Sequence, residues 1–135
     1  NYMHNAAKII SIEIPFKVNT YDIDIAGHLN NIVYVRWLED LRIKCFSEIC
    51  SLQKLLANNY YLVVASCEMK YKKQIKLFDK PIGYMQLQSI NRGIYVFNAE
   101  IKVGTNTVFN ASQKCVIMNM TDNKMYSGKI EEIVF

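Results

Sequence analysis

Hydrophobic and polar residues alternate along several stretches of this chain, and the alternation predicts β-strands. Between residues 10 and 18 apolar side chains recur at every second position, which is typical of a strand with one buried face. Because Pro15 has no N–H to donate, this strand is expected at a sheet edge. Further strands are predicted at residues 61–73, 81–91, 94–103 and 107–120. Short turns at 91–93 and 104–106 make the last three antiparallel neighbours.

One segment instead repeats its apolar residues with the period of an α-helix. Residues spaced by three or four positions predict a helix from residue 30 or 31 to about residue 50, and they are Tyr34, Leu38, Leu41, Cys45 and Ile49. Asn30 is its expected N-cap. One narrow stripe is charged at i, i+4 spacing, with Arg36, Asp40, Lys44 and Glu48. Apolar residues cover much of the remaining circumference, namely Ile32, Val33, Val35, Trp37, Ile43 and Phe46. The helix is therefore expected to be mostly buried against a curved antiparallel sheet, in an α+β fold.

Composition indicates one soluble globular domain over residues 1–135, since 51% of the residues are hydrophobic and 21% are charged. The longest apolar run, residues 60–65, is far shorter than the roughly 20 residues of a membrane-spanning helix. No leader peptide is recognisable, so we expect a cytoplasmic protein without a membrane partner. The net charge of +4 suits an anionic small ligand as well as nucleic acid. The four cysteines contain no C-x-x-C pair and are expected to be free thiols, with no metal site.

The segment between the first strand and the helix carries the candidate chemistry. Asp24 lies shortly before the expected helix start, where free backbone N–H groups carry partial positive charge. Such N–H groups stabilise a carbonyl oxygen that gains negative charge during acyl transfer. A carboxylate supplies the other requirement, either as a general base on water or as a nucleophile. The arrangement predicts hydrolysis of an activated acyl group.

The residues from Asp24 to Trp37 read D-x-x-G-H-L-N-N-x-x-Y-x-x-W. This string resembles the signature of hotdog-fold thioesterases of the 4-hydroxybenzoyl-CoA thioesterase and acyl-CoA thioesterase type, with Leu29 replacing the usual valine. The resemblance extends over nearly the whole chain in element order and length. It implies a five-stranded antiparallel sheet wrapped around one long helix, and hydrolysis of acyl-CoA without a cofactor or metal.

The same resemblance assigns roles to residues of the loop. It implies that Asp24 is the catalytic carboxylate and that the backbone N–H of Asn31 polarises the thioester carbonyl. His28 either acts on the substrate or braces the loop, and Gly27 permits a tight turn or a close approach of the backbone to the ligand. Asp22 is expected to be solvated or structural. Tyr34 and Trp37 are expected to be aromatic residues of the core or of a dimer contact.

Alternative functions follow from the same segment. Plant acyl-ACP thioesterases show a similar D-x-N-x-H-V-N-N pattern, but Ala26 stands where that pattern has its first Asn, which favours CoA over ACP as the carrier. A non-catalytic acyl-CoA-binding protein is the other alternative. The presence of Asp24 argues against it, because binding alone needs no base there.

A cluster of basic residues follows the first strand of the meander, namely Lys70, Lys72, Lys73 and Lys76. We expect Lys70 and Lys72, which share a strand face, to bind the phosphates of CoA. Lysines at strand ends also serve solubility, which is the alternative interpretation. Without a phosphate-binding loop or basic residues interleaved with exposed aromatics, no nucleic-acid partner is expected. The resemblance implies a homodimer or homotetramer with active sites at the dimer boundary.

Overall fold

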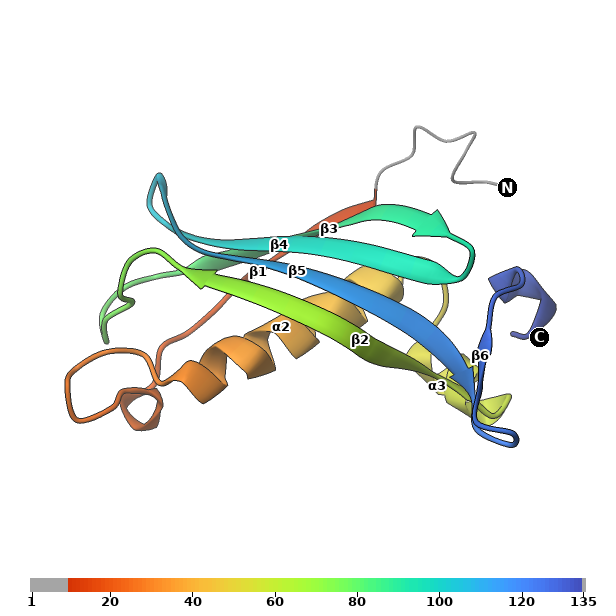
Figure 1. Cartoon of the computed structure of the whole chain (residues 1–135). Helices are drawn as coiled ribbons and strands as arrows, with labels where there is room; N and C mark the ends of the chain where they lie inside the picture. The colour runs from red at the N-terminus through yellow and green to blue at the C-terminus, as the bar shows by residue number, and fades with distance from the viewer. Residues whose placement is uncertain (1–9, 135) are drawn as a thin grey trace.

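The computed structural model describes residues 10–134, and Figure 1 shows a curved antiparallel sheet with one long helix on one face. The strands are β1 (Ile10–Pro15), β2 (Tyr60–Tyr71), β3 (Ile82–Asn91), β4 (Ile94–Val103), β5 (Asn106–Asn119) and β6 (Lys124–Tyr126). The helices are α2 (Asn31–Phe46) and α3 (Leu52–Ala57), with 3-10 turns η1 (Thr20–Asp22) and η2 (Ile130–Glu132). The element order matches the one predicted from the sequence, apart from the short elements α3, β6, η1 and η2.

The five long strands lie in the order β1-β3-β4-β5-β2, and each neighbouring pair is antiparallel. The short strand β6 pairs with the C-terminal end of β5. β1 is an edge strand, as Pro15 predicts, and β2 forms the opposite edge. The predicted turns join β3 to β4 and β4 to β5, and Gly93 and Gly104 supply positive φ angles of 80° and 63° there.

The hydrophobic core lies between α2 and the sheet face that it covers. Seven helix residues are buried there, namely Val33, Tyr34, Trp37, Leu38, Leu41, Cys45 and Phe46. The Trp37 ring stacks on Phe16 at 4.5 Å between centroids, and Tyr34 packs 4.6 Å from Phe109. Both motif aromatics are therefore core residues. The sheet wraps around one long helix, as expected for the hotdog fold.

The predicted C-terminal end of the helix is wrong, because α2 ends at Phe46 and a second helix, α3, begins at Leu52. Ser47 donates its hydroxyl to the Lys44 carbonyl oxygen at 2.6 Å, and Ser51 accepts the Lys54 N–H at 3.1 Å as the N-cap of α3. Ile49 and Cys50 remain largely buried in the turn between the helices. Their burial explains why the apolar spacing continued past the end of α2.

The prediction of a mostly buried helix is wrong on one side of α2. Ile32, Val35 and Ile43 are 52%, 50% and 39% exposed. This side faces the edge strand β2, since Ile43 and Leu62 of β2 line one small hollow. The charged stripe is exposed as predicted, but none of its side chains forms an ion pair within residues 10–134. Lys44 instead donates to the carbonyl oxygen of Glu13 in β1 at 3.0 Å.

Candidate active site

The loop before α2 folds as a miniature hairpin. The Asn30 N–H donates to the Asp22 carbonyl oxygen at 2.8 Å, and the Asp24 N–H donates to the His28 carbonyl oxygen at 2.9 Å. Between these two rungs, Ile23 and Leu29 form a β-bridge. The hairpin returns the chain directly to the start of α2, and Asp24 lies two residues along it from the Asp22–Asn30 contact that precedes the helix.

Gly27 makes the tight turn of this hairpin. Its φ is 83°, in the region that favours glycine, and its N–H donates to the Asp24 carbonyl oxygen at 3.0 Å. A Cβ atom at this position would meet no other atom within 4 Å. The positive φ, rather than close packing, therefore requires glycine here, and the tight-turn interpretation is confirmed.

The two aspartates of the hairpin have different environments. Asp22 is 6% exposed, and its Oδ2 accepts the main-chain N–H of Asn19 at 2.8 Å and the Asn19 side-chain amide at 3.1 Å. Asp24 is exposed, and its Oδ1 accepts the N–H groups of Ala26 and His28 at 2.9 and 3.1 Å. Within residues 10–134 no hydrogen bond reaches Oδ2 of Asp24. Asp22 thus orders the loop, while Asp24 presents one unengaged carboxylate oxygen.

The start of α2 leaves one backbone donor without an acceptor among the residues that the structure describes. Asn30 is the N-cap, as predicted, because its Oδ1 accepts the Ile32 N–H at 3.3 Å and its carbonyl oxygen accepts the Val33 N–H at 2.9 Å. The Asn31 N–H has no acceptor in the described part of the chain, and the residue is exposed. A free N–H at a helix N-terminus stabilises negative charge on a carbonyl oxygen.

His28 contributes its main chain to the hairpin through both hydrogen bonds to Asp24. Its side chain is half-buried, and the imidazole has no hydrogen-bond partner among residues 10–134. The sequence left open whether His28 braces the loop; in the structure it does so through its backbone. The ring is left available for a substrate.

The connection between β2 and β3, residues 72–81, supports the hairpin from the side. The Leu29 N–H donates to the carbonyl oxygen of Ile75, a fully buried residue, at 2.9 Å. Figure 1 shows the hairpin and this connection at the same end of the sheet. Tyr71, at the end of β2, packs edge-on against Tyr34 at 5.0 Å. Burial, with a smaller effect of Tyr71, raises the pKa of Tyr34 to about 12, so this phenol stays protonated at neutral pH.

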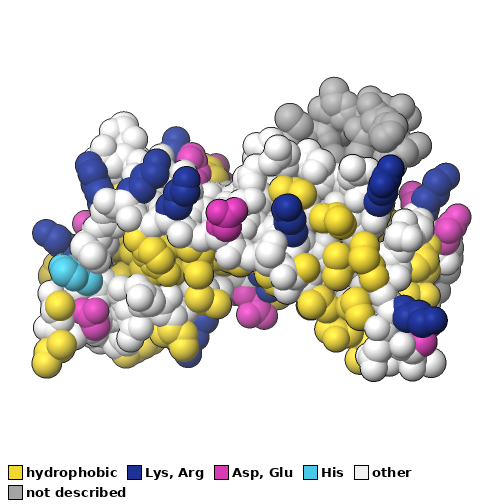
Figure 2. Space-filling view, in the orientation of Figure 1, with side chains coloured by type: hydrophobic (Ala, Val, Ile, Leu, Met, Phe, Trp, Pro, Cys, Tyr) yellow, Lys and Arg dark blue, Asp and Glu magenta, His cyan; other side chains and the backbone are white. Residues whose placement is uncertain are grey.

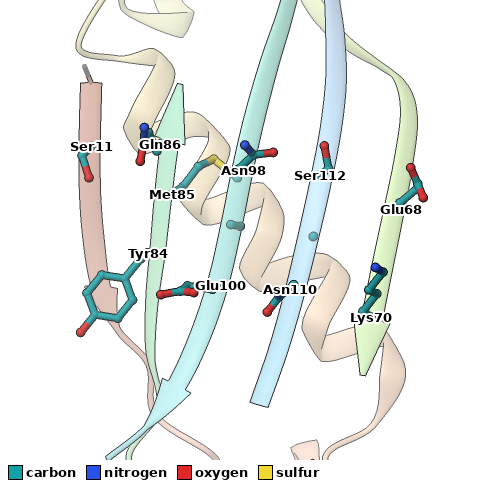
Figure 3. Close-up of a pocket in the computed structure, with 12 residues that line it drawn as sticks. Ser11, Glu68, Lys70, Tyr84, Met85, Gln86, Asn98, Glu100, Asn110 and Ser112 are labelled. Atoms are coloured by element: carbon teal, nitrogen blue, oxygen red, sulfur yellow. The ribbon is translucent and has the colours of Figure 1, made fainter. Parts of the chain in front are cut away.

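The structure separates the lysines of the basic cluster. Lys70 lies on the sheet face away from α2, where it lines a hollow of about 510 Å³ together with polar side chains from all five long strands (Figure 3). Asp24, His28 and Asn31 do not line that hollow. Lys72 and Lys73 begin the connection that supports the hairpin, and both of their N–H groups donate to the Val108 carbonyl oxygen.

An apolar surface follows α2 and β2 away from the hairpin. It is defined by Ile32, Val35 and Ile43 of α2 with Leu62, Met69 and Tyr71 of β2, and we call it the α2–β2 flank. Figure 2 shows hydrophobic areas on both halves of this view of the molecule. Sequence reasoning missed this surface, because helical periodicity does not distinguish core positions from exposed apolar ones.

Besides the hairpin, the cysteines, possible metal ligands and possible membrane-spanning helices bear on what the protein can do. All four cysteines are free; Cys45, Cys50 and Cys115 are buried and Cys67 is exposed. Burial raises the pKa of both Cys45 and Cys115 to about 11, which keeps them protonated. Residues 10–134 contain no group of three His, Cys, Asp or Glu side chains arranged to hold a metal ion. In the same part of the chain, no helix has the length and apolar character needed to cross a membrane.

Comparison with known proteins identifies the family. A family model described as the thioesterase-like superfamily matches residues 18–132. The long-chain acyl-CoA thioesterase FadM of Escherichia coli (strain K12) is 30% identical over 80 residues, which cover 59% of this chain and 61% of FadM. The match thus spans less than two thirds of that relative.

Solved structures show the same fold. The DHNA-CoA thioesterase from Staphylococcus aureus superposes with a TM-score of 0.77 at 18% identity, covering 88% of this chain and 80% of that one. The probable thioesterase YbaW from Escherichia coli gives 0.73 at 22% identity, covering 93% and 99%. Since the matched family model includes the hairpin, α2 and the long strands β2 to β5, this chain belongs to the thioesterase-like superfamily.

Proposed function

We propose that this protein hydrolyses acyl-CoA thioesters to a carboxylic acid and CoA. One observation carries the proposal: an exposed carboxylate, Asp24, is held by a short hairpin beside a helix N-terminus whose first N–H, that of Asn31, has no acceptor among residues 10–134. Membership of the thioesterase-like superfamily supports thioester hydrolysis as the reaction that these groups serve.

In the proposed reaction the thioester carbonyl oxygen accepts the Asn31 N–H. Asp24 either removes a proton from the attacking water or attacks the carbonyl carbon itself, in which case water later releases the acid. The carbon–sulfur bond breaks, and CoA leaves as a thiolate, so a strong general acid is unnecessary. Removal of one such oxyanion donor costs on the order of 3 kcal/mol in other enzymes, and we expect that scale here.

The connection at residues 72–81 is the proposed site for the CoA phosphates. It carries Lys72, Lys73 and Lys76 at the same end of the sheet as Asp24. Lysine binds phosphate as a mobile point charge. Lys72 is therefore a proposed substrate-binding residue, together with Gly27, whose backbone lies in the turn facing open space. Lys70, on the opposite sheet face, is the less suitable of the two predicted lysines.

We further propose that the protein acts as a homodimer joined along β2. This edge strand is 12 residues long and lies beside the exposed apolar side of α2. A long unpaired edge is a template for another strand. The β1 edge is less suited to pairing, because Pro15 lacks an N–H and Lys44 occupies the Glu13 carbonyl oxygen. Antiparallel pairing of two β2 strands would also cover the α2–β2 flank.

The test is thiol release from acetyl-, octanoyl-, palmitoyl- and benzoyl-CoA by the wild type and by Asp24→Asn. Asparagine keeps an oxygen for the Ala26 and His28 N–H groups, so the hairpin should persist while kcat falls at least 100-fold. Asp122→Asn is the matched control, since Asp122 also accepts an N–H two residues ahead, that of Lys124, at 3.0 Å.

The outcomes separate the alternatives. An Asp24→Asn variant with the wild-type kcat would remove Asp24 from the mechanism. A wild type that binds acyl-CoA but releases no thiol would instead indicate a binding protein. Release from acyl-ACP and not from acyl-CoA would identify the other carrier.

A further inference from the structure

A chain of polar contacts crosses the gap between α2 and the edge strand β2. Arg42 of α2 donates from Nη1 to Oε1 of Gln113 in β5 at 3.1 Å, and Gln113 donates from Nε2 to Sγ of Cys67 in β2 at 3.5 Å. Gln113 is 4% exposed and sits among core residues on the helix-facing side of the sheet. We call these three side chains the polar bridge. A buried amide in this position is unusual, because an apolar residue would satisfy the core alone.

The polar bridge divides the α2–β2 flank into two apolar halves. The half next to the candidate catalytic hairpin carries Ile32, Val35 and Tyr71. The other half surrounds a hollow of about 80 Å³, lined by Glu39, Arg42, Ile43, Phe46, Leu52 and Leu62. Figure 2 shows hydrophobic side chains gathered in the left and right halves of the molecule, with a narrower middle between them. An apolar group that starts at the hairpin and follows the flank therefore meets the polar bridge before it reaches the second half.

The length of the first half of the α2–β2 flank follows from the positions of Asn31 and Arg42 on α2. Arg42 follows Asn31 by eleven positions on α2, which corresponds to about 16 Å along the axis, and long side chains lean back toward the helix N-terminus. An acyl group whose carbonyl oxygen accepts the Asn31 N–H has roughly 12–16 Å of helix surface before the guanidinium, with Ile32 and Val35 along it and Glu39 one turn before Arg42. That distance accommodates a chain of about ten carbons, or an aromatic acyl group.

Covering the Arg42 guanidinium with hydrocarbon is energetically unfavourable. Arg42 is half-buried and forms no ion pair with a carboxylate in the described residues, although Glu39 lines the same hollow. A longer chain would remove the remaining water from this cation without offering a hydrogen bond, which is unfavourable. The neutral partner Gln113 does not compensate the charge.

We propose that the polar bridge sets the acyl-chain length, so that acyl groups of up to about ten carbons are hydrolysed in preference to long ones. This inference rests on the proposed function. The occupant of the first half of the flank is the acyl chain, and the second copy in the homodimer closes the channel from outside. Removal of the bridge joins the two apolar halves and admits longer chains.

The experiment compares chains of 8 and 16 carbons in the full-length protein. We would measure kcat/KM with octanoyl- and palmitoyl-CoA, and Kd by calorimetry with the corresponding non-hydrolysable S-alkyl-CoA thioethers. The wild type is expected to prefer the shorter member at least tenfold in both. The double variant Arg42→Met, Gln113→Leu is expected to lose this preference, with the ratio shifting at least tenfold toward 16 carbons.

Two further variants make the result interpretable. Arg36→Met removes the same type of side chain from the exposed stripe of α2, so it should keep the wild-type ratio. Arg42→Met alone alters a half-buried position and leaves Gln113 in place; if circular dichroism shows that the double variant is unfolded, the single variant decides by the same shift in ratio.

The failures are distinguishable. Equal wild-type kcat/KM for both chains, or an unchanged ratio in the bridge variants, overturns the inference while thioester hydrolysis stands. If no acyl-CoA is hydrolysed, the proposed function fails, and the thioether Kd values still test the bridge. Affinity independent of alkyl length would then show that the second copy, rather than an acyl chain, occupies the flank, and the inference would be wrong.

Discussion

Replacement of Asp22 by alanine is expected to destabilise the fold much more than replacement of Asp24, although the two residues belong to the same hairpin. The Asp22 carboxylate is buried and accepts two hydrogen bonds from Asn19, one of them from the main chain. The Asp24 carboxylate is exposed, and water can replace it at the N–H groups of Ala26 and His28.

The expected sizes follow from these contacts. A hydrogen bond to a charged group contributes about 1.5–3 kcal/mol, and Asp22→Ala removes two while leaving a partly buried main-chain donor unpaired, so the free energy of unfolding should fall by about 3 kcal/mol. Asp24→Ala should lose roughly 1 kcal/mol, because solvent hydrates the released donors. For a domain of this size, the Asp22→Ala loss corresponds to a decrease in Tm of about 10 °C.

Urea unfolding followed by circular dichroism at pH 7 measures both differences. Asp22→Asn, which keeps one acceptor oxygen for Asn19, should lie between the wild type and Asp22→Ala. The two variants are expected to affect different properties: Asp22→Ala lowers stability, and Asp24→Ala lowers turnover. An Asp22→Ala variant within about 0.5 kcal/mol of the wild type would refute the assignment of Asp22 as the structural carboxylate.

Three further predictions concern thiols and assembly. With Ellman's reagent at pH 8, Cys67 should react rapidly because it is exposed, and Cys67→Ser should abolish the fast phase; a fast phase that survives would contradict the burial of the other thiols. Because burial raises the pKa of Cys45 and Cys115 from 9.0 to about 11, their protonated forms stabilise the fold fully below pH 9, and this contribution is lost as pH rises toward 11. Urea unfolding should therefore give a free energy of unfolding that is lower at pH 10 than at pH 8 by about 1 kcal/mol per thiol, and an unchanged value would disagree. Val35→Lys places a charge on the exposed apolar side of α2 and should convert a homodimer into monomers in sedimentation velocity, whereas an unchanged dimer would exclude that surface from the interface.

Much of the fold is predictable because strands such as β1 and β4 alternate apolar and polar residues with period two, while β2 begins with the continuous apolar run at residues 60–65. The meander strands begin and end within two residues of the predicted positions, and the turns at Gly93 and Gly104 have a recognisable composition. The helix end was not predictable from spacing. Ile49 and Cys50 are buried by a turn rather than by a continuing helix, and periodicity reports burial without reporting its cause.

Some features of the candidate site are likewise predictable from the sequence, and others are not. The motif places Asp24, Gly27 and Asn31 in one short segment, so local reasoning suffices to propose them. Asp22 and Asp24 differ because Asp22 ends the 3-10 turn η1, where its carboxylate accepts from Asn19, whereas Asp24 caps the exposed hairpin turn through Ala26 and His28. The contact between Arg42 and Gln113 joins positions 71 residues apart, so no local pattern contains it.

The hydrogen bond from Leu29 to Ile75 has a consequence for synthesis of the protein on the ribosome. The hairpin with Asp24 is made early, but its lateral support is made only after β2, and the sheet that holds α2 is completed later still. Domains generally complete their packing once their sequence has emerged. A nascent or truncated chain therefore displays the carboxylate without the geometry that orients it, and the site is assembled only when the second half of the chain folds.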